Sequence, residues 1–367
     1  MLKVEKFFLL IVTAILCLVG TFYIFNVGAT ASLRIPGVSD ANFLIKRQLI
    51  HLLIGAGTLM IGAAINIKWY YRWPYLLYGL ALALLIIPLI SGLGQASHGA
   101  QRWTSLFGQS VQLSEIVKFL LIVFFSYLIS RTVDWQVFLV YLVPPVLLML
   151  LQSDLGGLII MLGSIATMYF VAGAPWRVLL TFGAFGIGGL IIISSFGFRS
   201  DRIDAYLHPD EDLNDVGHHV YQSKIAIGRG GFLGQGIGQS RQKFTYLPEV
   251  HTDSIFAIIG EETGFAGAGF VLLLYWFFLY LLWRIIQYAN LTVEQKLLGY
   301  GILMLFLSQI FVNLGAISGL IPLTGLTLPF ISYGGSSLVT CMFLVGVMLS
   351  LAGQPPQVFV WRKKRYG

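Results

Sequence analysis

The sequence predicts an all-α, polytopic membrane protein, and three observations support that fold class. The chain has 367 residues, of which 57% are hydrophobic. Only 11% are charged, whereas about 25% is usual for a soluble globular domain. The mean hydropathy of +0.82 points the same way. This composition argues against a disordered chain, a soluble nucleic-acid-binding domain and a disulfide scaffold.

Ten apolar segments follow one another along the chain, and each predicts a membrane helix because a span needs roughly 20 apolar residues. They lie at residues 7–26, 48–66, 74–91, 114–130, 137–152, 155–173, 177–197, 254–283, 297–313 and 332–352. Pro144 and Pro145 predict a kink in the fifth segment. We expect residues 1–367 to form a single integral membrane domain.

Basic residues predict that both termini lie on the cytoplasmic side of the membrane. An even number of spans places both ends on one side. Lys3 and Lys6 precede the first span and a basic cluster at 362–365 follows the last, and cytoplasmic segments collect such residues. The net charge of +7 is partly explained in this way. Residues 198–253 then form a large extracytoplasmic loop between helices 7 and 8.

This loop is too long to be a simple connection. Residues 221–227 predict a short amphipathic helix at the membrane interface. Six glycines within 228–238 permit positive φ angles and a close approach of backbone N–H groups to a ligand. Six basic residues gather in the loop, namely Arg199, Arg202, Lys224, Arg229, Arg241 and Lys243. Either the loop simply escapes the topological charge rule, or these residues bind a phosphate or diphosphate.

Ionisable residues inside membrane spans are costly and are therefore candidates for function. Glu115 and Lys118 are three residues apart, a spacing that puts them on one helix face. They form either a structural ion pair or a pair that lines a cavity for polar substrate groups. Asp154, at the tight turn between spans five and six, either caps span six or contacts substrate directly.

Asp253 ends the long loop and begins span eight, where an apolar wall meets a basic, glycine-rich segment. It is either a helix-capping acid or a general base acting on a sugar hydroxyl. Glu261 and Glu262 lie deeper in the same span, so they must face a cavity, a cation or a partner. Arg102 and Trp103 precede span four, where Arg can bind phosphate and Trp can stack on a sugar.

Several stretches match a known family. They are residues 99–103, 112–118, 152–156, 225–238, 247–253 (LPEVHTD) and 328–337 (LPFISYGGSS). In this order, over essentially the whole chain, they resemble the SEDS family (shape, elongation, division and sporulation) of peptidoglycan glycosyltransferases, which includes FtsW and RodA. Leu113, Ser153 and Ser254 stand where the family usually has Pro, Pro and Phe, and these departures leave the charged groups in place. Residues 240–249 and 259–262 look more like the FtsW branch than RodA.

The resemblance implies ten transmembrane helices in the bacterial cytoplasmic (inner) membrane, with lipid II as substrate. It implies a class B penicillin-binding protein as a transmembrane partner, within a division or elongation complex, and no nucleic-acid partner. It also implies that Asp253 is the acid essential for polymerisation. A divalent cation, Mg²⁺ or Mn²⁺, between carboxylates and diphosphate is chemically reasonable.

The expected site combines these residues. Asp253 takes the proton from the acceptor hydroxyl, and the donor leaves as undecaprenyl diphosphate. Substrate-binding candidates are Arg102, Trp103, Glu115, Lys118, Lys224, Arg229, Arg241, Lys243, His251 and Ser336. Structural or cavity-lining candidates are Asp154, Glu261, Glu262, Tyr333, Gly334 and Gly335, the last three in a predicted re-entrant turn. Two alternatives remain: a lipid II flippase with the same basic cavity, and a non-catalytic scaffold for the penicillin-binding partner.

Overall fold

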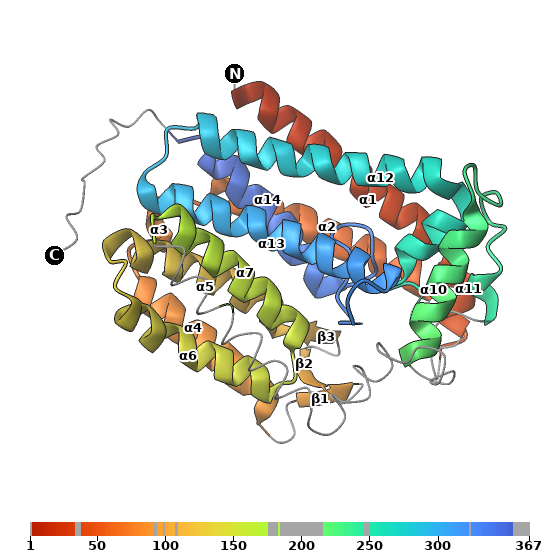
Figure 1. The fold of residues 1–367 in the computed structure, drawn as a ribbon, viewed down its shortest axis with the longest axis horizontal. Helices are drawn as coiled ribbons and strands as arrows, with labels where there is room; N and C mark the ends of the chain where they lie inside the picture. Colours follow the sequence, from red (N-terminus) through yellow and green to blue (C-terminus); the bar gives the residue numbers. More distant parts are fainter. Residues whose placement is uncertain are drawn as a thin grey trace.

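The protein is a bundle of long helices, seen here in a computed structural model (Figure 1). The structure describes residues 2–33, 38–90, 94–97, 100–106, 109–174, 183, 216–245, 250–322 and 324–354. Nine of the ten predicted spans coincide with helices in this part of the chain. The predicted seventh span, 177–197, lies outside the described residues apart from Gly183.

The spanning helices have the following bounds: α1 (Leu2–Leu33), α2 (Phe43–Ala64), α4 (Pro74–Ile86), α5 (Leu113–Arg131), α6 (Trp135–Leu151), α7 (Leu155–Val171), α12 (Ile255–Tyr288), α13 (Val293–Ser318) and α14 (Gly335–Leu351). A 3₁₀ turn, η1 (Ile87–Leu89), continues α4. Within the described residues, five helices are long and apolar enough to cross a bilayer, and the other four are shorter apolar helices. The predicted multi-pass membrane fold is therefore confirmed.

The centre of the bundle is formed by α5 and α14, which are buried along most of their length. Glycines allow α14 to pack closely on α2. A Cβ atom at Gly346 would lie 2.2 Å from the carbonyl oxygen of Leu59, and one at Gly62 would lie 2.6 Å from that of Phe343. Small residues that let helix backbones approach are typical of packing in membranes. Around this centre, α13 packs on α5 and α7, α4 on α5 and α6, and α1 on α2 and α12.

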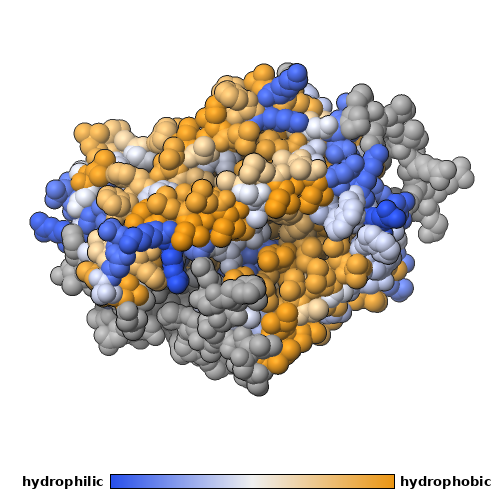
Figure 2. Space-filling view, turned by 180° about the vertical axis from the view of Figure 1, so that it is seen from behind, coloured by the Kyte–Doolittle hydropathy of each residue, from blue (hydrophilic) through white to orange (hydrophobic). Residues whose placement is uncertain are grey.

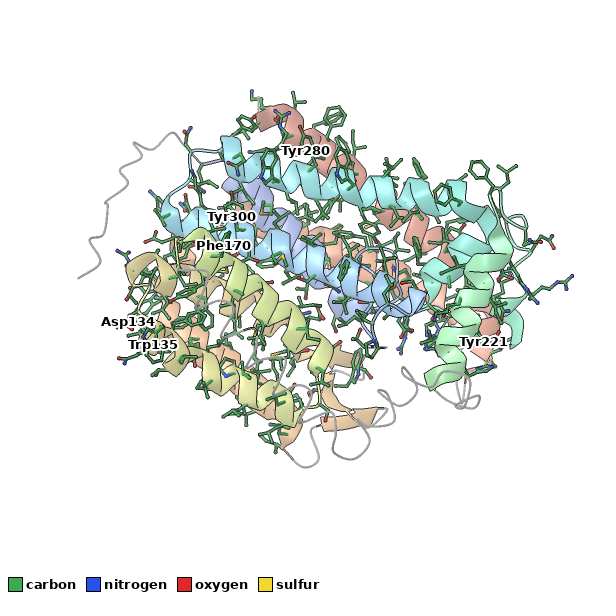
Figure 3. The ribbon with its side chains drawn as sticks, in the orientation of Figure 1. Asp134, Trp135, Phe170, Tyr221, Tyr280 and Tyr300 are labelled. Carbon is green, nitrogen blue, oxygen red and sulfur yellow. The ribbon has the colours of Figure 1, made fainter. Side chains whose placement is uncertain are left out.

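The outer face of the bundle is apolar. Figure 2 shows hydrophobic residues over the middle of the molecule, with hydrophilic residues mainly toward its two ends. Leu53 of α2 and Leu273 of α12 are among the exposed large side chains. Figure 3 labels Trp135 and Phe170 at one end and Tyr221 at the other, and all three are exposed. Aromatic side chains at both ends are expected where membrane meets water.

The two ends of the bundle differ. In Figure 1 the start of α1 and the end of α14 lie at one end. The other end carries α10 (Val216–Gly230), α11 (Gln242–Thr245) and a small antiparallel sheet of β1 (Gly94–Ser97), β2 (Ala100–Leu106) and β3 (Gln109–Gln112). We call this the sheet end. The sheet was not predicted; it occupies the connection between spans three and four, and pairs Trp103 of β2 with Gln95 and Gln112.

Candidate functional site

Asp253 lies at the sheet end, in the turn at 250–253 that leads into α12. Its side chain is 9% exposed. Ser254 occupies the N-cap of α12, so Asp253 stands one residue before the position from which a side chain usually caps a helix. The hydroxyl of Thr252 donates to Asp253 Oδ1 at 3.2 Å. The carboxyl is thus partly shielded and oriented by its own turn.

The backbone around Asp253 is held by two other elements. Asn313 of α13 donates through Nδ2 to the carbonyl oxygens of Asp253, at 3.1 Å, and of Leu326, at 2.6 Å. The N–H of Tyr333 donates to the carbonyl of His251 at 2.8 Å. These bonds join three segments that are far apart in the sequence. Nothing in the sequence pattern distinguished Asn313 from other polar residues of its span.

The segment 319–334 connects α13 to α14. The re-entrant turn predicted at 333–337 is only partly present, because α14 already begins at Gly335. In this connection the N–H of Tyr333 donates to the carbonyl of His251, so it is hydrogen-bonded within the protein. Ser336, in the first turn of α14, accepts from the N–H of Gln112 at 3.0 Å. Gly335 admits a side chain from α2, because a Cβ atom there would lie 2.6 Å from His51 Nε2. Gly334 is close to Thr327 in the same way, so tight packing accounts for both glycines.

Glu115 and Lys118 form the predicted ion pair, which is buried in the first two turns of α5. Lys118 Nζ lies 2.8 Å from Glu115 Oε1, and the two side chains are 0% and 4% exposed. A charge pair buried this completely carries a large desolvation cost. The pair lies at the sheet end, because α5 begins directly after β3.

Asp154 caps α7, as one of its two interpretations predicted. Its side chain accepts from the N–H of Gly157 at 3.0 Å. The residue is fully buried. Ser153, which precedes it, adopts a positive φ of 62°, so the chain reverses between α6 and α7 within three residues.

Helix α12 is interrupted at Gly264, which has φ 64° and ψ −162°. The glycine-rich segment after α10 takes over the hydrogen bonds that the break leaves open. The N–H groups of Gln235 and Gly236 donate to the carbonyls of Glu261 and Glu262, at 2.9 and 3.0 Å. In return, Phe265 and Ala266 donate to the carbonyls of residues 231 and 232, at 2.8 and 3.0 Å. The loop and the broken helix therefore complete each other.

This exchange corrects the expectation for the glycine-rich segment. Its positive φ angles are present, for example 84° at Gly234, but the N–H groups at Gln235 and Gly236 meet α12 rather than a ligand. A Cβ atom at Gly234 would lie 2.2 Å from the carbonyl oxygen of Glu262, and one at Gly230 would lie 2.0 Å from that of Gly260. Only glycine permits this approach. The helix predicted at 221–227 is present as the longer α10, which packs on α12.

Glu261 and Glu262 both have partners, as expected of acids within a span. Glu262 lies 3.2 Å from Lys243 Nζ, and Asn26 of α1 donates to its other oxygen at 2.5 Å. Lys243 also donates to Asn26 Oδ1 at 2.8 Å. Glu261 accepts from the hydroxyl of Ser240 and from the N–H of Arg241. The ammonium group of Lys243, a predicted substrate ligand, is thus engaged within the protein.

The remaining basic candidates are placed differently. Lys224, Arg229 and Arg241 are exposed at the sheet end. Lys224 lies over the C-terminus of α13, since a Cβ atom at Gly319 would be 2.4 Å from its Nζ, where a positive charge is favourable. Arg102 belongs to β2, but its side chain lies outside the described structure. Its neighbour Trp103 is half-buried.

Two residues at the sheet end were missed by the sequence analysis. Arg47 and His51 lie one turn apart near the start of α2, and both are half-buried. The ring of Tyr333 lies 6.0 Å from that of His51 and 5.5 Å from that of His251. Both are ionisable residues near the end of a predicted span. The same feature identified Glu115 and could have identified these two residues.

Several buried polar atoms at this end have no hydrogen-bond partner among the described protein atoms. They include both amide atoms of Gln48, the hydroxyl of Ser114, Gln309 Oε1 and Asn313 Oδ1. Buried polar atoms are nearly always paired with protein, water or ligand. The sheet end therefore has hydrogen-bonding capacity that the described residues do not use.

The described residues do not fit a resident metal. Within the parts of the chain that the structure covers, no group of three His, Cys, Asp or Glu side chains is arranged to hold one. No chemical step is assigned to a divalent cation on this basis.

Comparisons with known proteins agree with this architecture. The family model for the cell cycle proteins FtsW, RodA and SpoVE matches residues 7–355. The chain belongs to that family. Stage V sporulation protein E of Bacillus subtilis (strain 168) is 37% identical over 357 residues, covering 94% of this chain and 96% of that protein. A probable peptidoglycan glycosyltransferase FtsW of Geobacter sulfurreducens (strain DL-1 / KN400) is 35% identical, covering 95% and 96%.

Solved structures of the FtsW/RodA/SpoVE family share the fold. The rod shape determining protein RodA of Thermus thermophilus superimposes with a TM-score of 0.69 at 26% identity, over 94% of this chain and 95% of that one. A chain from a peptidoglycan synthase complex that coordinates polymerization and crosslinking gives 0.77 at 28% identity, over 95% and 97%. The family predicted from the motifs is confirmed. The relatives named FtsW agree with the resemblance of residues 240–249 and 259–262 to the FtsW branch. The sporulation protein has a comparable sequence identity to this chain.

Proposed function

We propose that this member of the FtsW/RodA/SpoVE family is a peptidoglycan glycosyltransferase that polymerises lipid II into glycan strands and releases undecaprenyl diphosphate. One observation carries the proposal: the backbone of Asp253 is fixed by Asn313 at the end of the bundle where Glu115, Lys118 and the turn at 328–334 also gather. Relatives named peptidoglycan glycosyltransferase FtsW support the same reaction.

The proposed orientation places the sheet end on the outer side of the cytoplasmic (inner) membrane. Lys3 and Lys6 and the basic cluster at 362–365 then lie in the cytoplasm, in accord with the preference of cytoplasmic segments for basic residues. The start of α1 and the end of α14 share one end of the bundle (Figure 1), as this topology requires. Asp253 would then face lipid-linked precursors that have already crossed the membrane.

In the proposed mechanism Asp253 acts as the general base. Its carboxylate accepts the proton of the acceptor hydroxyl while that oxygen forms a bond to the anomeric carbon of the donor. The bond from this carbon to the diphosphate oxygen breaks, and the diphosphate leaves with the electron pair. Because a diphosphate is already a good leaving group, the site needs stabilisation of negative charge more than a strong acid.

The positive charge that stabilises the diphosphate must come from basic side chains that are not already paired with an acid of the protein. Lys118 and Lys243 are engaged by Glu115 and Glu262. Arg229 and Arg241 are exposed, so they are better placed than the two lysines to meet a ligand. Mg²⁺ or Mn²⁺ would enter this scheme with the diphosphate of the substrate rather than on a protein site.

A class B penicillin-binding protein is the proposed partner, contacting the transmembrane helices. Support comes from the structurally similar chain in a peptidoglycan synthase complex and from the exposed apolar surface of the bundle. The partner and other division or elongation proteins would bring polymerisation and cross-linking to the same place.

The test is polymerisation of lipid II by purified protein, with and without the partner and Mg²⁺ or Mn²⁺. Glycan strands should form with the unaltered chain and be lost in Asp253→Asn and Asp253→Ala, both still monodisperse. Asp40→Asn is the matched control, because Asp40 is an acid at the same end that pairs with exposed Lys46. Its activity should be unchanged.

Two results would replace this proposal. Transport of lipid II that survives Asp253→Ala, without any glycan from purified protein, would identify a flippase. Full cellular function after loss of Asp253 and of the loop charges would identify a scaffold.

A further inference from the structure

A cluster formed by Arg47, His51, Tyr333 and His251 adjoins Asp253 and plays no part in the mechanism above. Arg47 and His51 are four residues apart on α2, a spacing that places them on one helix face. The phenol of Tyr333 accepts a hydrogen bond from Arg47. Its ring lies near both imidazoles, 6.0 Å from that of His51 and 5.5 Å from that of His251.

Each member of the cluster is held in place by packing. The guanidinium carbon of Arg47 lies 4.4 Å from the ring centre of Phe43, a cation–π contact that orients the group. His51 lies against Gly335, where a Cβ atom would be 2.6 Å from its Nε2. Tyr333 is tied by its N–H to the carbonyl of His251, two residues before Asp253. Through this bond the cluster is joined to the turn that carries Asp253.

The positive charge of Arg47 is not neutralised by an acid in the described part of the chain. The buried lysines differ in this respect, because Lys118 and Lys243 each contact a glutamate. Arg is also the residue best suited to grip a phosphate through two parallel hydrogen bonds. Arg47 is thus a half-buried cation whose charge is available to a ligand.

A second, independent observation comes from Gln48. Its side chain is fully buried, and neither its amide nitrogen nor its amide oxygen has a hydrogen-bond partner among the described residues. It lies three residues before His51 on the inward side of α2. Because buried polar atoms are nearly always hydrogen-bonded, the described residues leave the hydrogen bonds of this amide to a further group.

We propose that Arg47, His51 and Tyr333 form a subsite for the diphosphate group of the lipid-linked saccharide. Arg47 supplies charge and a two-pronged contact, while the phenol and the imidazole N–H donate to phosphate oxygens. The subsite rests on the proposed function, since it takes the leaving group of that reaction. It adds Arg47 and His51, which neither the motifs nor the comparisons assign, and gives Tyr333 a role in binding.

The test compares two variants that each remove one positive charge from neighbouring positions. Arg47→Gln alters the subsite, whereas Lys46→Gln alters an exposed residue that pairs with Asp40. Binding of undecaprenyl diphosphate to purified protein in nanodiscs is measured directly, without turnover. Loss of charge-assisted hydrogen bonds should weaken binding by about 10- to 100-fold in Arg47→Gln, with binding by Lys46→Gln unchanged. Arg47→Lys, which keeps the charge without the fork, should lie between them.

Competition with phosphatidylglycerol identifies the source of the phosphate. A subsite for the diphosphate requires that an excess of phosphatidylglycerol displaces the probe poorly. Equal competition would mean a general site for anionic lipid headgroups and would overturn the assignment. If Arg47→Gln does not yield monodisperse protein, Tyr333→Phe replaces it, and unchanged affinity in that variant would likewise contradict the proposal.

The outcomes for subsite and activity are separable. Undiminished binding in Arg47→Gln, together with loss of polymerisation in Asp253→Asn, would overturn the subsite and leave the glycosyltransferase intact. Arginine-dependent binding of the diphosphate by a chain that makes no glycan would preserve the subsite and overturn the reaction.

Discussion

Asn313 donates its side-chain amide to the backbone carbonyl of Asp253 across 3.1 Å, linking α13 to the turn that precedes α12. The same amide binds the carbonyl of Leu326, so one side chain holds both segments that border the proposed base. Asn313 is 2% exposed. It is a positioning residue, because it binds the backbone carbonyl of Asp253 and not its carboxylate.

Replacing Asn313 by Leu should therefore impair turnover more than binding. We expect kcat for polymerisation to fall by about 10- to 100-fold, because small displacements of a catalytic group are costly, while KM for lipid II changes little. Steady-state kinetics of the purified variant provide the measurement. Asn290→Leu is the control, since Asn290 is exposed in the connection between α12 and α13. A rise in KM alone would contradict a positioning role.

The ion pair of Glu115 and Lys118 yields a prediction that separates stability from function. Removing one partner, as in Lys118→Met, should lower the free energy of unfolding by about 3–5 kcal/mol, because a buried charge loses its counter-ion. The double variant Glu115→Gln/Lys118→Met should recover most of this loss. Thermal unfolding in detergent measures both. If glycan synthesis returns with stability, the pair is structural; if it stays absent, the pair contacts substrate.

Lys243 is predicted to act on Glu262 rather than on the diphosphate. Lys243→Met should therefore destabilise the protein, and the double variant Glu262→Gln/Lys243→Met should regain stability and measurable polymerisation. Arg241→Met, which removes an exposed charge two residues away, should leave thermal stability within about 0.5 kcal/mol. A double variant that is stable yet weakened in diphosphate binding would restore Lys243 as a ligand.

The break in α12 is predicted to depend on glycine at position 264. Gly264→Ala should lower stability strongly, because φ is 64° and the new Cβ atom would lie 2.4 Å from the N–H nitrogen of Gly234. Gly269→Ala in the same helix has nothing within 4 Å of its Cβ position and should be neutral or slightly stabilising, since Ala favours helix. Melting temperatures of the two variants, measured side by side, test this. Equal values would contradict the role given to the break.

Tyr333 is predicted to remain protonated at neutral pH. Burial raises the pKa of its phenol above the usual 10, although the charge and hydrogen bond of Arg47 oppose the shift. A raised pKa in the folded state means that this contribution to stability is complete below the unfolded pKa and is lost as pH rises through the folded value. Stability of the unaltered chain relative to Tyr333→Phe should therefore be constant from pH 6 to 9 and decline only above about pH 10. A decline near neutrality would contradict this.

The sequence alone determined the helical bundle and much of the candidate site. Long apolar segments must become helices in a membrane because every backbone polar group there needs an internal partner, so composition and spacing located nine spans that the structure describes. The pairing of Glu115 with Lys118 and the capping by Asp154 depend on neighbours within four residues. Such local relationships follow from helix geometry.

Only the tertiary structure decided which distant groups meet. Asn313 contacts Asp253, Lys243 contacts Glu262 and Asn26, and Arg47 contacts Tyr333. Each contact joins segments that are far apart in the sequence, so no spacing of residues along the chain predicts it. The sheet at 94–112 and the exchange of hydrogen bonds at Gly264 were also hidden, because each depends on backbone groups that are identical in every residue. The physical reason is that the pattern of apolar residues along the chain determines where helices form. Which side chains from different helices meet is determined by how the helices pack.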